Sequence, residues 1–266
     1  MDIRLIVTDM DGTLLDANHQ LPPNFVEVVT QLRERGIHWG IASGRQLANL
    51  KQRFDEVGVA VDLIAENGSL AQLANDPTPF FCDLTPVSAF EQVLRTALAI
   101  PGATPVLCGA TCAWVHQAYP EHFCEIARYF CETQTWQTIE SVAALSICKV
   151  AVYHPQAATE LYPKLQPCAS EAVRVILSGP NWVDVQMARI DKAHALEALM
   201  RQLGVEPQQT MVFGDYFNDV GMLTCGVHGV AMGNALPEIK ALTPYHALPN
   251  TQNGVMDYLQ RVGVLA

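Results

Sequence analysis

The chain has 266 residues, half of them apolar, enough to bury the core of one large or two smaller α/β domains. Its 16 basic and 27 acidic residues give a formal net charge of -11, and no lysine or arginine cluster stands out. This balance argues against nucleic acid or an anionic membrane surface as the partner. It leaves an anionic small substrate open, because the field at a site comes from its own residues and metal.

No membrane segment or leader is expected. The first residues run straight into an apolar strand, and no apolar stretch approaches membrane-spanning length. We therefore expect a cytoplasmic protein. The eight cysteines include no Cys-x-x-Cys pair, which favours reduced, mostly buried thiols. A zinc site at Cys108, Cys112 and His116 is disfavoured, since a second ligand pair at zinc spacing is missing.

The first predicted strand, around Leu5 to Val7, leads into Asp9-Met10-Asp11-Gly12-Thr13. Two carboxylates one residue apart then stand at a strand's end, where open α/β sheets place their chemistry. One can attack phosphorus and hold a divalent cation while the other handles the proton on the leaving group. A plain Asp-Gly turn is the alternative for this pentapeptide alone. An EF-hand loop does not fit, because Leu14 stands where its glycine would be.

Further strands and helices alternate along the chain. Residues 24–35 have apolar side chains at helical spacing, residues 38–42 read as a strand, and another helix follows. Later strands are predicted at 63–65, 210–213 and 229–232. Each strand delivers polar or glycine residues at its end: Ser43-Gly44-Arg45, Glu66-Asn67-Gly68, Gly214-Asp215-Tyr216-Phe217-Asn218-Asp219 and Gly233-Asn234. In a parallel sheet these ends line one edge, so the residues are expected to form one site.

Residues 83–188 differ in pattern from the rest and predict a second, smaller α/β domain inserted into the first. Predicted helices cover residues 87–99, 121–130 and 157–165, and predicted strands cover 104–108, 147–153, 173–177 and 182–186. The expected organisation is a core made of residues 1–82 and 189–266, interrupted by this insert.

Lys192 stands in the first turn of a predicted helix that Asp191 caps. A cation there opposes the helix dipole at a cost of about 0.3–1 kcal/mol. A solvated lysine that tolerates this cost is one interpretation. The functional one is an ammonium beside an anion, binding the same phosphate as the amides at the helix end.

Together these motifs resemble those of a known family. In chain order, Asp9-x-Asp11-Gly12-Thr13, Ser43, Lys192 and Gly214-Asp215-x-x-Asn218-Asp219 resemble the four motifs of the haloacid dehalogenase superfamily, and the chain looks like its phosphatase branch. Asn67-Gly68, Met232-Gly233-Asn234-Ala235 and Gly254-Val255 resemble the Cof-type subfamily, of class IIB. The resemblance implies a Rossmann-like parallel-sheet core with an α/β cap inserted between the second and third motifs, where residues 83–188 lie.

Two features depart from the family's pattern. The usual Lys-Gly after the cap is Lys192-Ala193 here, a small-for-small change that should leave the lysine in place. Tyr216 and Phe217 are bulky at the variable positions of the last motif and are expected to narrow the site.

The resemblance also implies roles for individual residues. Asp9 would attack phosphorus and form an aspartyl-phosphate, and Asp11 would act as general acid and base. Mg²⁺ would be held by the Asp9 and Asp215 carboxylates and the Asp11 backbone carbonyl, with Asp219 supporting the metal shell. The residues expected to bind phosphate or substrate are Ser43, Gly44, Arg45, Lys192 and Asn218.

The expected function is therefore hydrolysis of small phosphorylated metabolites, with a sugar monophosphate as the leading substrate. A phosphomannomutase-like phosphotransferase and a non-catalytic binder of phosphorylated metabolites are the alternatives. A Rossmann dehydrogenase is weaker, since no Gly-x-Gly-x-x-Gly follows the first strand. The insert is expected to meet the leaving group, with Lys149, Asn181 and Asp184 as candidates for that contact. The oligomeric state stays open.

Overall fold

The computed structural model describes residues 2–156 and 158–265. The chain forms two compact units: Met1–Gly44, Lys51–Phe81 and Asp191–Ala266 make the first, and Arg45–Leu50 with Cys82–Ile190 the second. Over the described ranges, the helices are all too short or too polar to cross a membrane.

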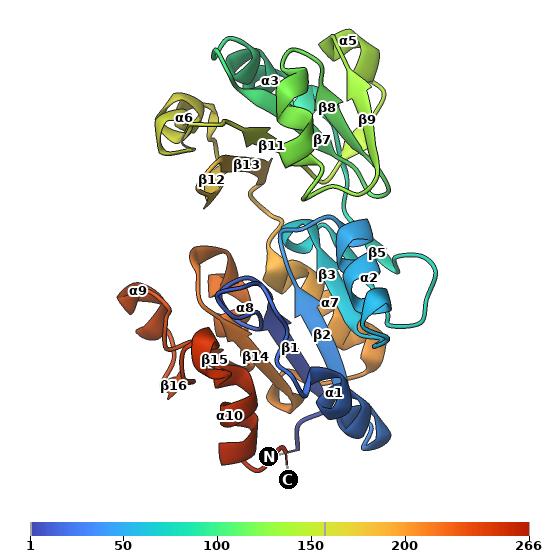
Figure 1. The fold of residues 1–266 in the computed structure, drawn as a ribbon, viewed down its shortest axis with the longest axis vertical. Helices are drawn as coiled ribbons and strands as arrows, with labels where there is room; N and C mark the ends of the chain where they lie inside the picture. The colour runs from blue at the N-terminus through green and yellow to red at the C-terminus, as the bar shows by residue number, and fades with distance from the viewer. Residues whose placement is uncertain (1, 157, 266) are drawn as a thin grey trace. The chain divides into compact units, whose positions relative to one another are not determined.

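The first unit is built on an eight-stranded sheet with the order β16-β15-β14-β1-β2-β3-β4-β5 (Figure 1). The six strands from β16 to β3 run parallel, and β4 is antiparallel to β3. The strands are β1 Leu5–Asp9, β2 His38–Ala42, β3 Asp62–Ala65, β4 Leu70–Gln72, β5 Phe81–Cys82, β14 Thr210–Gly214, β15 His228–Ala231 and β16 Tyr245–His246. All five residues of both β1 and β14 are buried, as expected of central strands covered on both faces.

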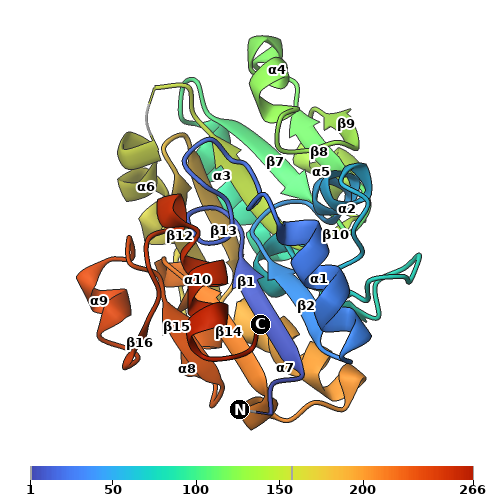
Figure 2. The same ribbon diagram turned by 60° about the horizontal axis from the view of Figure 1, so that its bottom comes forward.

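Helices cover both faces of this sheet. They are α1 Phe25–Glu34, α2 Leu47–Glu56, α7 Lys192–Leu203, α8 Val220–Thr224, α9 Pro237–Lys240 and α10 Gly254–Arg261. On one face, the ring of Phe25 in α1 meets Trp39 edge-on at 5.4 Å, and Tyr258 in α10 meets Phe213 at 5.6 Å. Figure 2 shows α1 and α10 in front of the strands.

The opposite face is closed by α7 and α8, and Gly229 of β15 lets α8 approach. A Cβ on Gly229 would meet the Leu223 carbonyl of α8 at 2.2 Å, whereas a Cβ on Gly40 of β2 would meet Leu199 of α7 at an ordinary contact distance of 3.5 Å. The result is a three-layered, mixed α/β arrangement. The predicted fold class is confirmed.

The second unit contains a six-stranded sheet of order β12-β13-β11-β7-β8-β9. Its strands are β7 Thr104–Cys108, β8 Ala113–His116, β9 Thr133–Trp136, β11 Lys149–Tyr153, β12 Val173–Gly179 and β13 Trp182–Met187. A separate short pair joins β6 Thr85–Pro86 to β10 Ser146–Ile147. The helices are α3 Glu91–Leu98, α4 Phe123–Ile126, α5 Ile139–Val142 and α6 Ala158–Leu165.

Several predicted elements of this unit differ from the observed ones. Strands β8 and β9 were not predicted. Strand β9 reads Thr-Gln-Thr-Trp and exposes its first three residues, which leaves no apolar alternation to detect. The helix predicted over 121–130 is reduced to α4 and a preceding turn of 3₁₀ helix. The helix predicted over 157–165 matches α6, except that residue 157 lies outside the described part of the chain.

Candidate active site

The end of β1 brings the first motif to the carboxyl edge of the sheet. Asp9 is its last residue, and its side chain is only 8% exposed. The chain then turns through Gly12, whose φ of +88° is a left-handed conformation that glycine adopts without strain. A Cβ at this glycine would lie 2.5 Å from an oxygen of Asp215, so the absence of a side chain lets the two motifs meet.

Strand β14 delivers the last motif beside the first. Thr13 donates a hydrogen bond to Oδ1 of Asp215 at 2.9 Å, across 202 positions of sequence. Asp219 is fully buried, and its Oδ2 accepts the backbone N–H groups of Asp215 and Tyr216 at 2.9 and 3.1 Å. The buried carboxylate therefore holds the loop in the shape that presents Asp215.

Lys192, the first residue of α7, is completely buried between two carboxylates. Its Nζ donates to Oδ1 of Asp9 at 2.5 Å and to Oδ1 of Asp219 at 2.7 Å. Asp191 caps the helix, accepting the backbone N–H of His194 at 2.9 Å. Gly68 approaches this turn so closely that a Cβ on it would lie 1.9 Å from the Asp191 carbonyl. The solvated-lysine interpretation is thus wrong.

The charges at this centre do not balance. Three carboxylates face one ammonium, so burial and the charges of Asp219 and Asp215 together raise the pKa of Asp9 despite Lys192. Burial, followed by the charge of Asp219, raises the pKa of Asp215 to about 6. Burial works against the ammonium of Lys192, but the two neighbouring carboxylates outweigh it and raise its pKa. The cluster lacks positive charge.

A hard cation fits that deficit. Within the described ranges, the acidic, histidine and cysteine side chains form one group able to hold a metal ion, in which Asp9, Asp215 and Asp219 place oxygens within 4.8 Å of one another. Oδ2 of Asp9 is buried and has no hydrogen-bond partner. Such an atom is costly unless a ligand satisfies it. An all-oxygen donor set suits a hard divalent cation. Among the described residues, Cys108, Cys112 and His116 do not form such a group.

The predicted phosphate-binding residues lie around the ends of β2 and β3. The buried Ser43 follows β2, and its carbonyl accepts the N–H of Asn67 at 3.0 Å. A Cβ on Gly44 would come within 2.8 Å of the Asn67 amide oxygen, which also accepts a 3.4 Å hydrogen bond from Asn218. The structure therefore brings Ser43, Gly44 and Asn218 together through Asn67.

Asp11 and Arg45 lie outside the carboxylate cluster. The Asp11 side chain is 41% exposed, and its Oδ1 lies 3.2 Å from Nδ1 of His19. An exposed carboxyl group can exchange protons with solvent. The side chain of Asp11 lies outside the carboxylate cluster, so its backbone carbonyl is the group expected to contact a metal. Arg45 follows Gly44 directly and is half-buried.

Three residues of the site were not assigned a role from the sequence. Thr13 fixes Asp215, Asn67 joins two of the loops, and the Asn234 side chain donates to the Gly12 carbonyl at 2.8 Å. All three belong to segments that carried the family resemblance. Their hydrogen bonds could not be predicted, because the partners lie in other loops, far away in the sequence.

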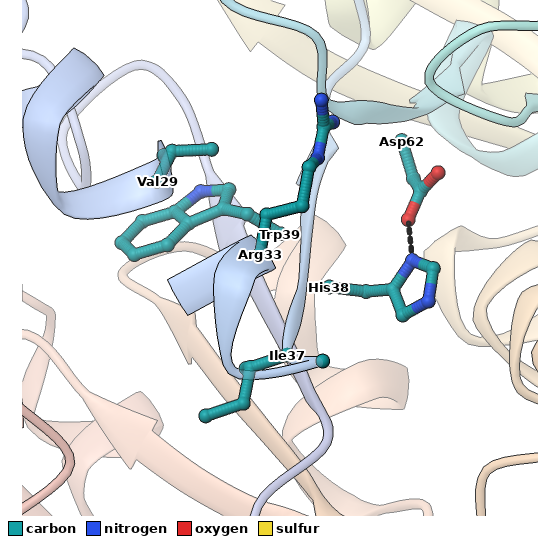
Figure 3. Close-up of a pocket in the computed structure, with 7 residues that line it drawn as sticks. Val29, Arg33, Ile37, His38, Trp39 and Asp62 are labelled. Carbon is teal, nitrogen blue, oxygen red and sulfur yellow. Dashed lines mark hydrogen bonds and ion pairs between the residues drawn. The ribbon is translucent and has the colours of Figure 1, made fainter. Parts of the chain in front are cut away.

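The first unit also contains a pocket that is distinct from the candidate active site. Figure 3 shows it beside the starts of β2 and β3, where Nδ1 of His38 lies 3.2 Å from Oδ2 of Asp62. Its lining comprises Val29, Arg33, Gly36, Ile37, His38, Trp39 and Asp62. Since Asp9 and Asp215 stand at the carboxyl ends of their strands, the pocket lies at the opposite edge of the sheet and contains none of the predicted site residues.

The candidates within the second unit also have definite contacts. Nζ of Lys149 and Oδ2 of Asp184 form a buried ion pair of 2.8 Å between β11 and β13. Asn181 donates to the carbonyls of His154 and Pro155 at 2.9 and 3.2 Å. Asn181 therefore serves the fold of its hairpin.

We expect Gly12→Ala to lower activity at least about tenfold while leaving the protein folded. The new methyl group would displace the Asp215 carboxylate, and the positive φ would add about 1 kcal/mol of strain. Gly58→Ala is the matched control: its φ is +71°, but no atom lies within 4 Å of the added Cβ. Steady-state kinetics and thermal melts of both variants check this. Equal losses of activity in the two would show that backbone strain, not displacement of Asp215, is responsible.

Comparison with known proteins places this geometry in a family. Residues 6–259 match the family of haloacid dehalogenase-like hydrolases. The chain is 27% identical to the 5-amino-6-(5-phospho-D-ribitylamino)uracil phosphatase YbjI of Escherichia coli, over 98% of this chain and 97% of that protein. It is 30% identical to the HMP-PP phosphatase of Serratia proteamaculans, over 97% and 94%.

Solved structures agree on the fold. SMU.1108c of Streptococcus mutans superposes with a TM-score of 0.83 at 22% identity, over 99% of this chain and 100% of that one. The sugar phosphatase BT4131, of subclass IIB, gives 0.80 at 20% identity, over 98% and 100%. The resemblance inferred from the motifs is confirmed. The chain belongs to the haloacid dehalogenase-like hydrolases and is an enzyme of their phosphatase branch.

Proposed function

We propose that the protein is a Mg²⁺-dependent phosphatase that hydrolyses small phosphorylated metabolites through an aspartyl-phosphate. The observation that carries the proposal is the buried Asp9 carboxylate. One of its oxygens is held by Lys192, and the other is left without a hydrogen-bond partner beside Asp215. This oriented carboxylate, in a site with an excess of negative charge, suits attack on a phosphate that arrives with its cation.

The proposed reaction has two steps. Asp9 forms an oxygen–phosphorus bond as the ester bond breaks, and Asp11 gives a proton to the leaving alcohol. Asp11 then takes a proton from water, whose oxygen attacks phosphorus and frees Asp9. Lys192, Ser43 and Asn218 hold the phosphoryl oxygens, with Gly44 and Arg45 beside them. The buried position of Lys192 supports this role, because an ammonium in a water-poor site acts strongly on nearby charge.

Magnesium would be held by the carboxylates of Asp9 and Asp215 and by the backbone carbonyl of Asp11. When bound, it supplies the positive charge that draws the phosphate dianion to the carboxylates. Both oxygens of Asp219 already accept hydrogen bonds, from Lys192 and from the loop amides. We therefore assign Asp219 to supporting the metal site.

The proposed substrates are phosphate monoesters of sugars and related metabolites. Two relatives with full-length similarity are named as a ribitylaminouracil phosphate phosphatase and an HMP-PP phosphatase. These names support small phosphorylated metabolites as the class, with a phosphorylated sugar or sugar-alcohol arm as one member. A phosphomannomutase-like transferase remains the second candidate and would move phosphate within a diphosphate without sustained release.

The domain organisation and location are part of the proposal. We propose residues 1–82 and 189–266 as the catalytic core and 83–188 as the inserted cap. The boundaries between the two compact units, next to Phe81 and Asp191, support this division. We propose a cytoplasmic, reducing location, supported by the free thiols of Cys82, Cys112, Cys124, Cys168 and Cys225.

A screen of phosphorylated metabolites with magnesium and phosphate detection tests the function. We expect sustained release of inorganic phosphate from several sugar monophosphates. Release limited to about one equivalent, with transfer to a second sugar phosphate, would favour the transferase instead.

Removal of the metal should abolish turnover. We expect EDTA to lower activity at least about a hundredfold and magnesium to restore it, because the carboxylates and the phosphate dianion otherwise repel one another. Calcium should inhibit, since its larger and looser shell misplaces the nucleophile. Full activity in chelated protein would contradict the proposal.

The thermal shift caused by magnesium should depend on pH. The pKa of Asp215 is raised to about 6 in the folded protein, so the metal-free protein binds a proton there more tightly than the unfolded chain does. Its stability therefore falls as pH rises from about 4 to about 6, the window in which protons stop competing with the cation. Magnesium should raise the melting temperature by several degrees at about pH 7.5 and little at about pH 4.5. Asp215→Asn should remove the difference.

A further inference from the structure

The segment that follows the first motif folds back beside Asp11. The backbone N–H of Leu15 donates to the carbonyl of Met10 at 2.9 Å, and residues 11 and 15 form an isolated β-bridge. The side chain of Leu15 is completely buried, which anchors this return of the chain. The next residues, 16–20, therefore stand close to the proposed general acid.

A tight turn over residues 16–20 fixes the backbone of His19. Oδ1 of Asp16 accepts the backbone N–H groups of Asn18 and Gln20, each at 2.8 Å. The N–H of Asp16 donates to the carbonyl of Gln20 at 3.0 Å, and the N–H of His19 donates to the carbonyl of Asp16 at 3.1 Å. Asp16 thus organises the whole turn through its side chain and its backbone.

The turn places His19 in an unusual backbone conformation. Its φ is +57°, in the left-handed region, where glycine lies without strain and most other residues are uncommon. The guanidinium of Arg53 donates to the carbonyl of His19 and holds the residue there. A glycine would serve this turn at least as well. The turn alone therefore gives no reason for a histidine at this position.

The imidazole of His19 contacts the proposed general acid. Its Nδ1 lies 3.2 Å from Oδ1 of Asp11, within the range of a hydrogen bond. An ionised carboxylate only accepts, so Nδ1 carries the hydrogen of this contact. The side chains of His19 and Asp11 are 68% and 41% exposed, and an exposed pair of two mobile side chains has little effect. Here the backbone is fixed on both sides, by the bridge at Asp11 and by the turn at His19.

We infer that His19 is a positioning residue that acts through Asp11. The imidazole N–H holds one oxygen of the Asp11 carboxyl group. It thereby fixes the direction in which this group gives a proton to the leaving oxygen and later takes one from water. A wrongly oriented acid transfers its proton poorly, because the transfer needs hydrogen-bond reach of the reacting oxygen. The inference rests on the proposed function and adds to it a residue outside the four motifs.

The test compares two esters of similar shape whose leaving groups differ in their need for a proton. Phenolate is a much stronger base than p-nitrophenolate, so phenyl phosphate depends more on the acid than p-nitrophenyl phosphate does. We expect His19→Ala to lower kcat/KM about tenfold for phenyl phosphate and less than about twofold for p-nitrophenyl phosphate. The ratio of the two values, phenyl over p-nitrophenyl, is the readout.

Two further substitutions at this position separate the side chain from the backbone. Asparagine also occurs in the left-handed region, and its Nδ2 is as many bonds from Cβ as Nδ1 of histidine is. His19→Asn should therefore recover most of the ratio, and an asparagine variant as impaired as His19→Ala would overturn the inference. His19→Gly relieves the backbone but supplies no donor, so it should match His19→Ala. A glycine variant with the parent's ratio would show that only the shape of the turn matters, which also overturns the inference.

A double variant tests whether His19 acts through Asp11. Adding His19→Ala to Asp11→Asn should change the ratio by less than about twofold, because the group that the imidazole positions is already lost. A further fall of about tenfold would show that His19 acts independently of Asp11 and would overturn the inference.

His38 provides the matched control. Its Nδ1 lies 3.2 Å from Oδ2 of Asp62, the same kind of contact at the opposite edge of the sheet. His38→Ala should leave the ratio unchanged, and thermal melts check that each variant is folded.

The outcomes separate this inference from the proposed function. If the parent releases phosphate from neither ester, both are overturned, because an activated ester needs only the nucleophile and the metal. Turnover of p-nitrophenyl phosphate alone would mean that no acid assists departure, which overturns the inference. If Asp11→Asn lowers both esters equally, Asp11 is not the acid, and the inference is overturned with that assignment. If Asp11→Asn lowers the ratio and His19→Ala does not, the inference alone is overturned.

Discussion

Asp9→Asn is expected to reduce phosphate release at least about a thousandfold while the protein stays folded. The amide oxygen that replaces the carboxylate is a poor nucleophile, and one negative charge of the proposed metal site disappears. The fold should tolerate the change, because asparagine has nearly the same shape and burial, which raises the pKa of Asp9, makes its negative charge costly there. Lys192 keeps its hydrogen bond to Asp219. Steady-state phosphate assays and thermal melts measure both effects.

Asp62→Asn is the matched control for this substitution. Asp62 is 2% exposed and accepts the backbone N–H of Ala74 at 2.9 Å, but it stands at the opposite edge of the sheet. We expect a lower melting temperature and nearly unchanged turnover. Turnover by Asp9→Asn within tenfold of the parent would remove Asp9 from the role of nucleophile.

Asp11→Asn should act on the leaving group. It should impair alkyl phosphates nearly as strongly as Asp9→Asn does, because an alkoxide needs a proton to depart. Esters with a good leaving group, such as p-nitrophenyl phosphate, should suffer less. A uniform loss over both kinds of ester would argue that Asp11 positions the loop and does not transfer the proton.

Much of the first unit follows from the sequence because its strands are buried on both faces. Strand β2 begins and ends at the predicted residues, and β1 and β14 are buried along their whole length, with three adjacent apolar residues each. The second unit is harder to predict, since β9 exposes three of its four residues and carries no such pattern. Strands can be predicted from the sequence where burial requires apolar residues. They cannot be predicted where an exposed segment is a strand only because it pairs with a neighbouring strand.

The same division holds for the site. The types of residue at the strand ends were predictable, because parallel strands collect their carboxyl ends at one edge. The hydrogen bonds that set the geometry join residues far apart in sequence, such as Thr13 and Asp215 or Asn67 and Asn218. A local sequence pattern carries no information on such long-range hydrogen bonds. The dual role of Asp219, bound both to Lys192 and to the loop amides, was likewise visible only in three dimensions.

Lys192→Met is expected to damage both activity and stability. Methionine fills similar space but leaves two buried carboxylates without their ammonium, and breaking a buried ion pair in this way typically costs about 3–5 kcal/mol. Turnover should fall at least about a hundredfold, because the phosphoryl oxygens lose their buried cation. Chemical denaturation and phosphate release in magnesium measure the two losses.

The stability loss should depend on pH in a defined direction. Burial already raises the pKa of Asp9, and without the ammonium this carboxylate binds a proton still more readily in the folded protein than in the unfolded chain. By linkage, the penalty is largest above the raised pKa of Asp9 and shrinks as pH falls through it. The variant should therefore be closer to the parent at about pH 5 than at about pH 8.

A double variant separates charge from chemistry. Combining Lys192→Met with Asp219→Asn removes the ammonium together with one of the buried charges it neutralises, so part of the lost stability should return. The amide oxygen introduced by Asp219→Asn can still accept both loop hydrogen bonds. The ammonium is absent, however, so activity should stay low. A double variant that regains turnover along with stability would show that Lys192 serves only to neutralise buried charge. A double variant that regains stability but not turnover would show that the Lys192 ammonium also binds the phosphoryl group.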